Sequence, residues 1–170
     1  MLNASVGKKE ANKIFKRTTN NLFRNQEPRQ MSNSLNSKEP LKIILDSNAL
    51  FVPLELKMDI FEETKRLLNR NLDFILLSPV KNELELLAAK NSPKTRREAM
   101  YALRLAEKCK YVVVENSEKL STDDVIVKVS KAWNSPVFTN DRKLRKRLKD
   151  ISVPVIYVRQ KSRLGIDGLT

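Results

Sequence analysis

Acidic side chains are the residues of this sequence best placed to do chemistry. Four acids share one feature, in that each lies at or shortly after the carboxyl end of a predicted strand: Asp46, Glu83, Asp123 and Asp141. Open parallel sheets place their sites in the crevice beyond these strand ends, so residues distant in the sequence would converge there. Carboxylates gathered in this way raise one another's pKa unless a cation compensates. A divalent metal would do so, and it could activate water and stabilise a phosphate during displacement.

Residue types that are missing from the chain exclude most other catalytic chemistry. The chain has no histidine and one cysteine, Cys109, so neither Ser-His-Asp or Cys-His catalysis nor a Cys/His zinc site can be built within it. Its three glycines, Gly7, Gly165 and Gly168, form no glycine-rich loop for a nucleotide phosphate. Kinase, P-loop and dinucleotide-binding functions are therefore excluded. Carboxylates remain, and these are natural ligands of Mg²⁺ and Mn²⁺.

Each acid also has a structural explanation that competes with metal binding. Asp46-Ser47-Asn48 could be turn chemistry after a strand, and Glu83 taken alone is better explained as a solvated helix residue. Asp141 could cap the next helix, in which case capping and metal binding would compete for the same carboxylate oxygens. The agreement of four positions, rather than any one of them, supports the metal-site hypothesis.

Two adjacent aspartates compete for the third position. Ser121-Thr122-Asp123-Asp124 fits a capping box with Asp124 as its fourth residue. Asp123 also has an explanation other than metal binding, because the dipole of the helix N-terminus favours an acidic side chain there. We assign metal binding to Asp123 and capping to Asp124, and both stay in the candidate ligand set.

The charge of the chain indicates a polyanionic partner. Lys and Arg number 33 against 20 Asp and Glu, a formal net charge of +13, and such a surplus favours nucleic acid. No stretch approaches the roughly 20 apolar residues of a membrane-spanning helix, and the N-terminus lacks the apolar run of a signal sequence. We expect a cytoplasmic protein with no membrane partner.

Short apolar runs alternate with amphipathic stretches from residue 41 onward, a pattern typical of βαβ units around a parallel sheet. An α/β fold is therefore predicted. Helices are expected at about 58–69, 78–90, 92–108, 121–133 and 142–149, with Ser78-Pro79 and Ser92-Pro93 as two of their starts. The strands are expected near Lys42–Leu45, Phe74–Leu77, Tyr111–Val114, Val137–Thr139 and Val155–Val158.

Residues 1–40 differ from the rest of the chain. They carry eight basic and three acidic side chains, are rich in Asn and Ser, and show little apolar periodicity. This composition predicts a flexible basic arm over 1–40, followed by a single domain over 41–170.

Several segments, in order along the chain, resemble the motifs of PIN domains. Ile43–Leu50 resembles the opening strand and its Asp-Ser/Thr-Asn turn, and Leu77–Leu84 is similar to the second acidic motif. Thr122–Ile126 looks like the third motif and Phe138–Arg142 like the fourth. The ending Val153–Ser162 looks most like the PIN endonucleases of small-subunit ribosome assembly and their archaeal relatives. The resemblance spans about residues 41–168.

This resemblance implies a three-layer αβα fold with a central parallel sheet of about five strands, and a Mg²⁺- or Mn²⁺-dependent endoribonuclease. The implied catalytic and metal-binding residues are Asp46, Glu83, Asp123 or Asp124, and Asp141. Supporting roles are implied for Ser47, Asn48, Thr139 and Asn140. The implied partners are RNA, in particular ribosomal RNA precursor, and ribosome assembly factors. Whether one chain completes the site is left open, so a homodimer is also considered.

Basic residues gather beside the fourth acid. Residues 141–163 contain nine basic and two acidic side chains, which predicts phosphate contacts that weaken steeply with salt. The competing explanation is a solvated helix with Leu144 and Leu148 turned inward. Aromatic residues are sparse, so stacking on bases is not predicted. The predicted RNA-binding residues are Arg142, Lys143, Arg145, Lys146, Lys149, Arg159, Lys161 and Arg163.

Other functions remain as alternatives. One is the toxin of a toxin-antitoxin pair, which shares the PIN domain and its acids. Another is a non-catalytic RNA-binding ribosome assembly factor on the same scaffold. A phosphatase is disfavoured, because Asn48 stands where that chemistry expects a second acid two residues after Asp46.

Overall fold

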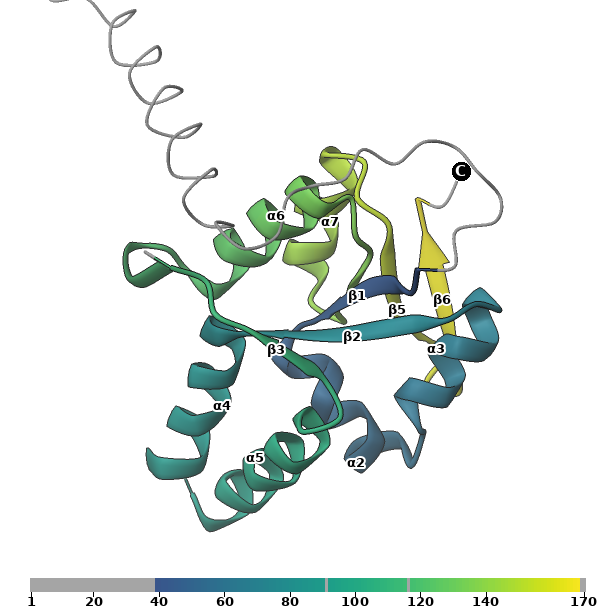
Figure 1. Ribbon diagram of the computed structural model, residues 1–170. Helices are drawn as coiled ribbons and strands as arrows, with labels where there is room; N and C mark the ends of the chain where they lie inside the picture. The colour runs from purple at the N-terminus through teal and green to yellow at the C-terminus, as the bar shows by residue number, and fades with distance from the viewer. Residues whose placement is uncertain (1–38, 91, 116, 169–170) are drawn as a thin grey trace, which may run out of the picture. The chain divides into compact units, whose positions relative to one another are not determined.

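The computed structural model describes residues 39–90, 92–115 and 117–168. Nearly all of the predicted arm therefore lies outside the described residues. The described chain forms one six-stranded sheet in the order β3-β2-β1-β4-β5-β6 (Figure 1). The strands are β1 (Leu41–Leu45), β2 (Leu72–Leu77), β3 (Lys110–Val112), β4 (Val137–Phe138), β5 (Val155–Arg159) and β6 (Arg163–Asp167).

Five of these strands are parallel, as the sequence predicts, and they place their carboxyl ends at one edge. Ile44 pairs with Ile75 on one side and Val137 on the other, so β1 lies in the middle of the sheet. The sixth strand was not predicted. It pairs antiparallel with β5 through a short turn, with Tyr157 opposite Gly165.

Helices fill the connections between the parallel strands. The predicted caps Ser92 and Ser121 both accept a hydrogen bond from the first turn of their helices. The short helices between β1 and α3 were not predicted. The helical elements are η1 (Ser47–Phe51), α2 (Val52–Leu56), α3 (Ile60–Leu68), α4 (Ser78–Lys90), α5 (Pro93–Ala106), η2 (Ser117–Lys119), α6 (Thr122–Trp133) and α7 (Arg142–Asp150).

The helices cover both faces of the sheet. Figure 1 shows α6 and α7 on one face and α2, α4 and α5 on the other. This confirms the predicted three-layer α/β fold, with a sheet of six rather than about five strands. None of the described helices is long and apolar enough to cross a membrane.

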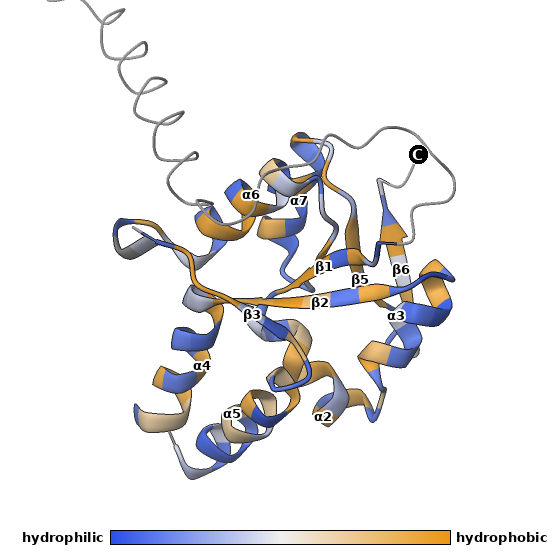
Figure 2. Ribbon diagram, viewed as in Figure 1, coloured by the Kyte–Doolittle hydropathy of each residue, from blue (hydrophilic) through white to orange (hydrophobic). Residues whose placement is uncertain are grey.

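The core forms where the strands meet these two helical layers. Ile43, Ile44 and Leu45 of β1 are fully buried, and Figure 2 shows the central strands as largely hydrophobic. Leu144 and Leu148 are the buried residues of the otherwise basic α7. Each fully buried leucine stabilises the fold by about 1.5–3 kcal/mol, so α7 is held firmly enough to present Asp141 at its N-terminus.

Candidate active site

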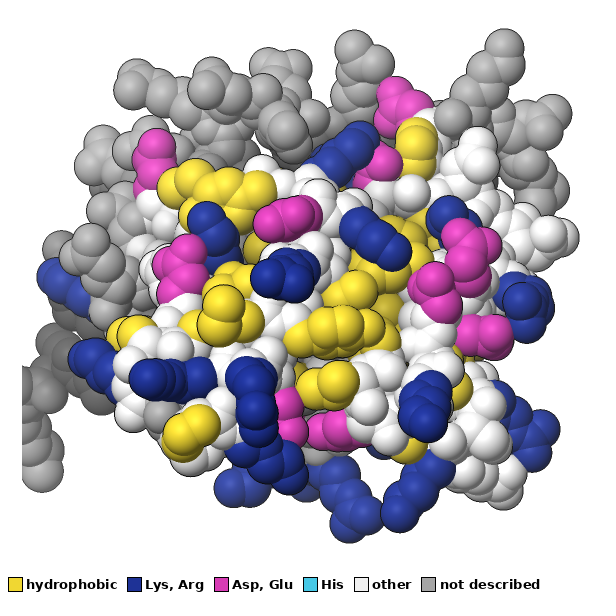
Figure 3. All heavy atoms as spheres, turned by 90° about the horizontal axis from the view of Figure 1, so that it is seen from below, with side chains coloured by type: hydrophobic (Ala, Val, Ile, Leu, Met, Phe, Trp, Pro, Cys, Tyr) yellow, Lys and Arg dark blue, Asp and Glu magenta, His cyan; other side chains and the backbone are white. Residues whose placement is uncertain are grey.

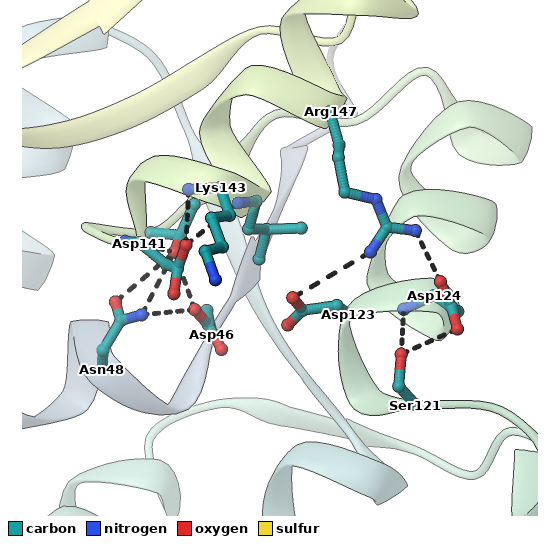
Figure 4. A network of polar contacts seen from close by, with 10 residues as sticks. Asp46, Asn48, Ser121, Asp123, Asp124, Asp141, Lys143 and Arg147 are labelled. Atoms are coloured by element: carbon teal, nitrogen blue, oxygen red, sulfur yellow. Dashed lines mark hydrogen bonds and ion pairs between the residues drawn. The ribbon is translucent and has the colours of Figure 1, made fainter.

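Asp46 is the most buried of the four candidate acids, with 4% of its surface exposed. It directly follows β1, and its backbone N–H donates to the carbonyl of Phe138. Its Oδ1 accepts the Ser47 N–H at 2.7 Å, and its Oδ2 accepts the Thr139 hydroxyl at 2.7 Å. The Asn48 amide also donates to Oδ2 (Figure 4). Together, the three hydrogen bonds to its side-chain oxygens hold the carboxylate in one orientation.

The polar residues around Asp46 link the ends of three strands. Asn48, after β1, accepts the backbone N–H of Asn140 through Oδ1 at 2.9 Å. Asn140, after β4, accepts the N–H of Val158 in β5 at 2.8 Å. Thr139 Oγ1 accepts the Asp141 N–H at 3.1 Å. The positions Ser47, Asn48, Thr139 and Asn140, which the family resemblance indicates as supporting residues, are thus all joined to Asp46 or to one another.

Asp141 caps the N-terminus of α7, as one of the two sequence-based explanations predicts. Its Oδ1 accepts the N–H groups of Lys143 at 2.6 Å and Leu144 at 3.0 Å. Both capping bonds use one oxygen, and no hydrogen bond among the described residues uses Oδ2. Capping and coordination of a cation can therefore coexist on this carboxylate.

Asp123 and Asp124 have different surroundings, although they are adjacent on α6. Asp124 accepts hydrogen bonds from the Ser121 hydroxyl at 2.7 Å and from the Arg147 guanidinium. The Ser121 hydroxyl in turn accepts the Asp124 N–H at 3.1 Å, so these two residues cap the helix together. The hydrogen bond from the Ser121 side chain is the main reason that the pKa of Asp124 is lowered. Asp123 meets Arg147 only at 4.0 Å.

The electrostatics show that the acids from different elements act on one another. Burial raises the pKa of Asp46, and the charges of Asp123 and Asp141 raise it further, against the hydrogen bonds from Thr139 and Ser47. Coulombic repulsion of this kind requires the carboxylates to lie near one another. Figure 4 shows Asp46, Asp123 and Asp141 around a common space.

Glu83 belongs to the same electrostatic group. Burial raises its pKa, and the charges of Asp46 and Asp123 raise it as well. Burial also raises the pKa of Asp123, followed by the charge of Asp141. All four predicted acids therefore lie at one edge of the sheet, although Asp46 follows β1, Glu83 and Asp123 lie in α4 and α6, and Asp141 precedes α7.

The chemistry of these donors fits a hard divalent cation. The group offers carboxylate oxygens, which such cations prefer. Burial and then the charges of neighbouring acids raise three of the pKa values, and a cation would favour the charged form of each carboxylate. In their present conformations, no three Asp, Glu, His or Cys side chains of the described residues lie close enough together to hold a metal ion. Coordination would thus require the carboxylates to rotate toward the common space.

The predicted RNA-binding residues fall into two groups. Arg145 and Lys149 turn toward β6, where Lys149 Nζ lies 2.6 Å and an Arg145 nitrogen 3.5 Å from Asp167 Oδ2. The Arg145 guanidinium also lies 3.6 Å from the centre of the Tyr157 ring. The other predicted RNA-binding residues are exposed and make no ion pair among the described residues, namely Arg142, Lys143, Lys146, Arg159, Lys161 and Arg163.

Two features of the site were missed by sequence reasoning. Arg147 was not among the predicted functional residues, yet it links α7 to both aspartates of α6. No sequence signal marks it, because the contact depends on how two helices pack. The side chain of Lys143 extends toward Asp46 and Asp141 (Figure 4), a more specific place than its predicted role of general phosphate contact.

The fold and this acidic edge define a class of α/β domains that gather carboxylates beyond the carboxyl ends of parallel strands. Residues 43–161 match the family model described as "PIN like domain". The chain belongs to the PIN-like domain family. This confirms the resemblance found in the sequence motifs.

Known proteins provide further comparisons. The chain is 30% identical over 128 residues to Ribonuclease VapC4 of Methanocaldococcus jannaschii, covering 75% of this chain and 98% of that protein. It is 27% identical over 96 residues to Ribonuclease VapC9 of Archaeoglobus fulgidus, covering 56% and 68%. The solved structure of the PIN domain endonuclease Utp24 superimposes with a TM-score of 0.66 and 25% identity, covering 77% of this chain and 94% of that one.

Proposed function

We propose that this protein is a divalent-metal-dependent endoribonuclease whose metal is held by Asp46, Glu83, Asp123 and Asp141. Family membership, two relatives named as ribonucleases and a neighbour named as an endonuclease support this class of hydrolase. The observation that carries the proposal is the gathering of four carboxylates at one edge of the sheet, where burial first and then the charges of neighbouring acids raise the pKa values of Asp46, Glu83 and Asp123.

We assign the third ligand to Asp123 rather than to Asp124. Asp124 is already engaged with Ser121 and Arg147, and these contacts lower its pKa. Asp123 has the opposite shift, caused by burial and by Asp141. A carboxylate that gains from a nearby cation is the better candidate for a ligand.

The remaining residues would orient the reaction. A bound Mg²⁺ or Mn²⁺ ion would activate water and neutralise charge on the phosphate. Asp46 would be kept in position by Thr139 and Asn48, which already bond to it. Lys143, which extends toward the acids, would hold the scissile phosphate through its ammonium group.

Ribosomal RNA precursor is the substrate that we propose. The choice rests on the resemblance of residues 153–162 to the PIN endonucleases of small-subunit assembly and on the exposed basic residues Arg142, Arg159 and Lys161. The exposed side chains would contact phosphates over more than one nucleotide. Assembly factors would then present the RNA to the site.

Cleavage of precursor RNA tests the function. The chain is incubated with ribosomal RNA precursor and either Mn²⁺ or Mg²⁺, beside Asp46→Asn and Asp141→Asn. We expect defined fragments from the wild-type chain and a loss of about 10²–10³-fold in rate for each variant, the scale for removing one preorganised electrostatic group. Asp150→Asn, an exposed aspartate at the other end of α7, is the matched control and should cleave normally.

A second RNA, unrelated to the ribosomal precursor, tests which substrate the chain prefers. An unrelated RNA of equal length should be cut more slowly than the precursor if the substrate assignment is right. Equal cleavage of both, with growth arrest on expression, would favour the toxin instead. RNA binding without cleavage in either metal would identify a non-catalytic assembly factor.

A further inference from the structure

A second surface, apart from the acidic edge, combines apolar and basic groups. Two hollows of about 380 Å³ each share Asp59, Phe61 and Lys108. The first lies where α2, α5 and the start of α3 meet, and the second lies beside it along α3 and the first residues of β2 and β3. The first is lined by Tyr101 and Leu105 and also by Lys57. This volume falls within the range of about 300–1,000 Å³ that small-ligand sites occupy. Figure 3 shows hydrophobic side chains at the centre of the face that lies below in Figure 1, with Lys and Arg around them.

Cations line the helix beside the first hollow. Arg97, Tyr101 and Arg104 are spaced by four and three residues, so they lie on one side of α5. All three are exposed, with 39% of Tyr101 accessible. Lys108 follows just past the helix end, over the Phe61 ring. An aromatic ring thus stands among three basic side chains.

Most acids near this surface already have a partner. Asp59 accepts the N–H groups of Phe61 and Glu62 at the start of α3. Three further acids form ion pairs: Glu62 with Lys65, Asp73 with Lys110 and Glu98 with Lys94. Among the described residues, no ion pair joins a carboxylate to Lys57, Arg97, Arg104 or Lys108. Against these four cations stand three acids without an ion pair in the described part of the chain, Asp59, Glu55 and Glu107, so the surface keeps a small positive surplus.

We infer that this face, defined by Lys57, Arg97, Tyr101, Arg104 and Lys108 and called here the α5 groove, binds single-stranded RNA. One base would stack on Tyr101 at the mouth of the hollow, and the basic side chains would hold the phosphates on either side. The inference rests on the proposed function, and it adds a second site where the same RNA is held away from the cleavage site.

Charge favours RNA over a second copy of the chain as the occupant. A two-fold contact through the α5 groove would place the same surface on both subunits. Arg97, Arg104 and Lys108 of one copy would then face those of the other. RNA instead supplies the phosphate that each unpaired cation lacks.

Binding measured without divalent metal tests the α5 groove while no cleavage can occur. The probe is a labelled oligouridine, titrated against the full chain in EDTA at several salt concentrations. We expect Tyr101→Ala to weaken binding about tenfold, while Tyr101→Phe, which keeps the ring, binds like the wild-type chain. The double variant Arg97→Ala/Arg104→Ala should lower the slope of log affinity against log salt by about 1.4, or about 0.7 for each phosphate contact.

Matched variants lie elsewhere on the surface. Leu86→Ala removes an exposed apolar side chain of α4, and Lys131→Ala removes an exposed cation of α6. Neither should change binding. Asp46→Asn should lose cleavage and keep its affinity for oligouridine, which separates the two sites.

The outcomes distinguish this inference from the proposed function. If the wild-type chain cleaves precursor RNA while the groove variants bind oligouridine normally, the α5 groove is not an RNA site and the nuclease function stands. If the wild-type chain neither cleaves nor binds RNA, both proposals are wrong. If light scattering shows that Tyr101→Ala changes a dimer into a monomer while RNA affinity is unchanged, the groove belongs to a second copy of the chain.

Discussion

Two charged clusters lie on either side of α7, and they are built on opposite principles. At the acidic edge, carboxylates face one another, and their burial and mutual repulsion raise the pKa values of Asp46, Glu83 and Asp123. At the β6 cluster, formed by Arg145, Lys149, Tyr157 and Asp167, one carboxylate receives two cations and a hydroxyl. The hydrogen bond from Lys149 is the main reason that the pKa of Asp167 is lowered.

The difference separates a site for chemistry from a support for the fold. Like charges kept together without a partner cost stability, so the acidic edge supports the proposal that a cation binds there. At the β6 cluster the opposite charges neutralise one another instead. Arg145 and Lys149, which the sequence predicts to bind RNA, therefore serve first to attach α7 to β6.

The strongest test of the acidic edge compares the two neighbouring aspartates of α6. Asp123→Asn should lower the rate of Mn²⁺-dependent cleavage about 10²–10³-fold, because it removes a proposed metal ligand. Asp124→Asn is the matched control with the same chemistry one residue away. It should cost less than about tenfold, since it disturbs only the cap and Arg147. Equal losses would mean that the two residues share the third position.

Removal of the support for Asp46 should have a smaller effect. Thr139 is fully buried, donates to Asp46 Oδ2 and accepts the Asp141 N–H. Thr139→Ala should weaken Mn²⁺ binding about 10–100-fold, the scale for groups that orient metal ligands. Thr139→Ser keeps the hydroxyl and should restore most of the affinity, as measured by calorimetric titration. A Thr139→Ser variant as weak as Thr139→Ala would show that the methyl group, not the hydroxyl, supports the site.

The contrast between the clusters also explains what could be predicted from the sequence. The acids of the proposed cleavage site follow strand ends, and a parallel sheet brings all such ends to one edge whatever the details of helix packing. β1 and β2 were predicted within two residues, because their buried apolar runs are continuous. Local order along the chain was therefore enough to predict that Asp46, Glu83, Asp123 and Asp141 lie near one another, and their role as metal ligands stays a proposal.

The β6 cluster could not be found in this way. β6 has the sequence RLGID, in which only Leu164 is buried, so no apolar alternation marks it as a strand. Its Gly165 is explained only by the pairing with β5, because a Cβ there would lie 3.3 Å from the Tyr157 ring. The partners of Arg145 and Lys149 depend on that hairpin, and α2 is too short, at five residues, to show a helical period.

The pH dependence of metal binding should differ from that of an ordinary carboxylate site. Metal binding requires deprotonated carboxylates. Since the pKa values of Asp46, Glu83 and Asp123 are raised, protons compete with the metal at a higher pH than usual. Mn²⁺ affinity should rise with pH through the weakly acidic range, by about tenfold per pH unit for each proton released, and then level off. Affinity that does not change between the usual carboxyl pKa of about 4 and neutral pH would contradict the proposed coupling.

The smallest effect is expected at the β6 cluster, where substitution should alter stability and not chemistry. Because Lys149 and Asp167 are partly exposed, their pair should contribute only about 0.5–1 kcal/mol, as in other surface ion pairs. A double-mutant cycle with Lys149→Met and Asp167→Asn, followed by urea unfolding, measures this coupling.

Since the pKa of Asp167 is lowered in the fold, the coupling should be present above the usual carboxyl pKa of about 3.9 and lost as the pH falls below it. The rate of cleavage by Asp167→Asn should stay within about twofold of wild type at low temperature, because none of the four candidate ligands contacts Asp167. A loss of rate as large as that of Asp123→Asn would contradict the distinction between the two clusters.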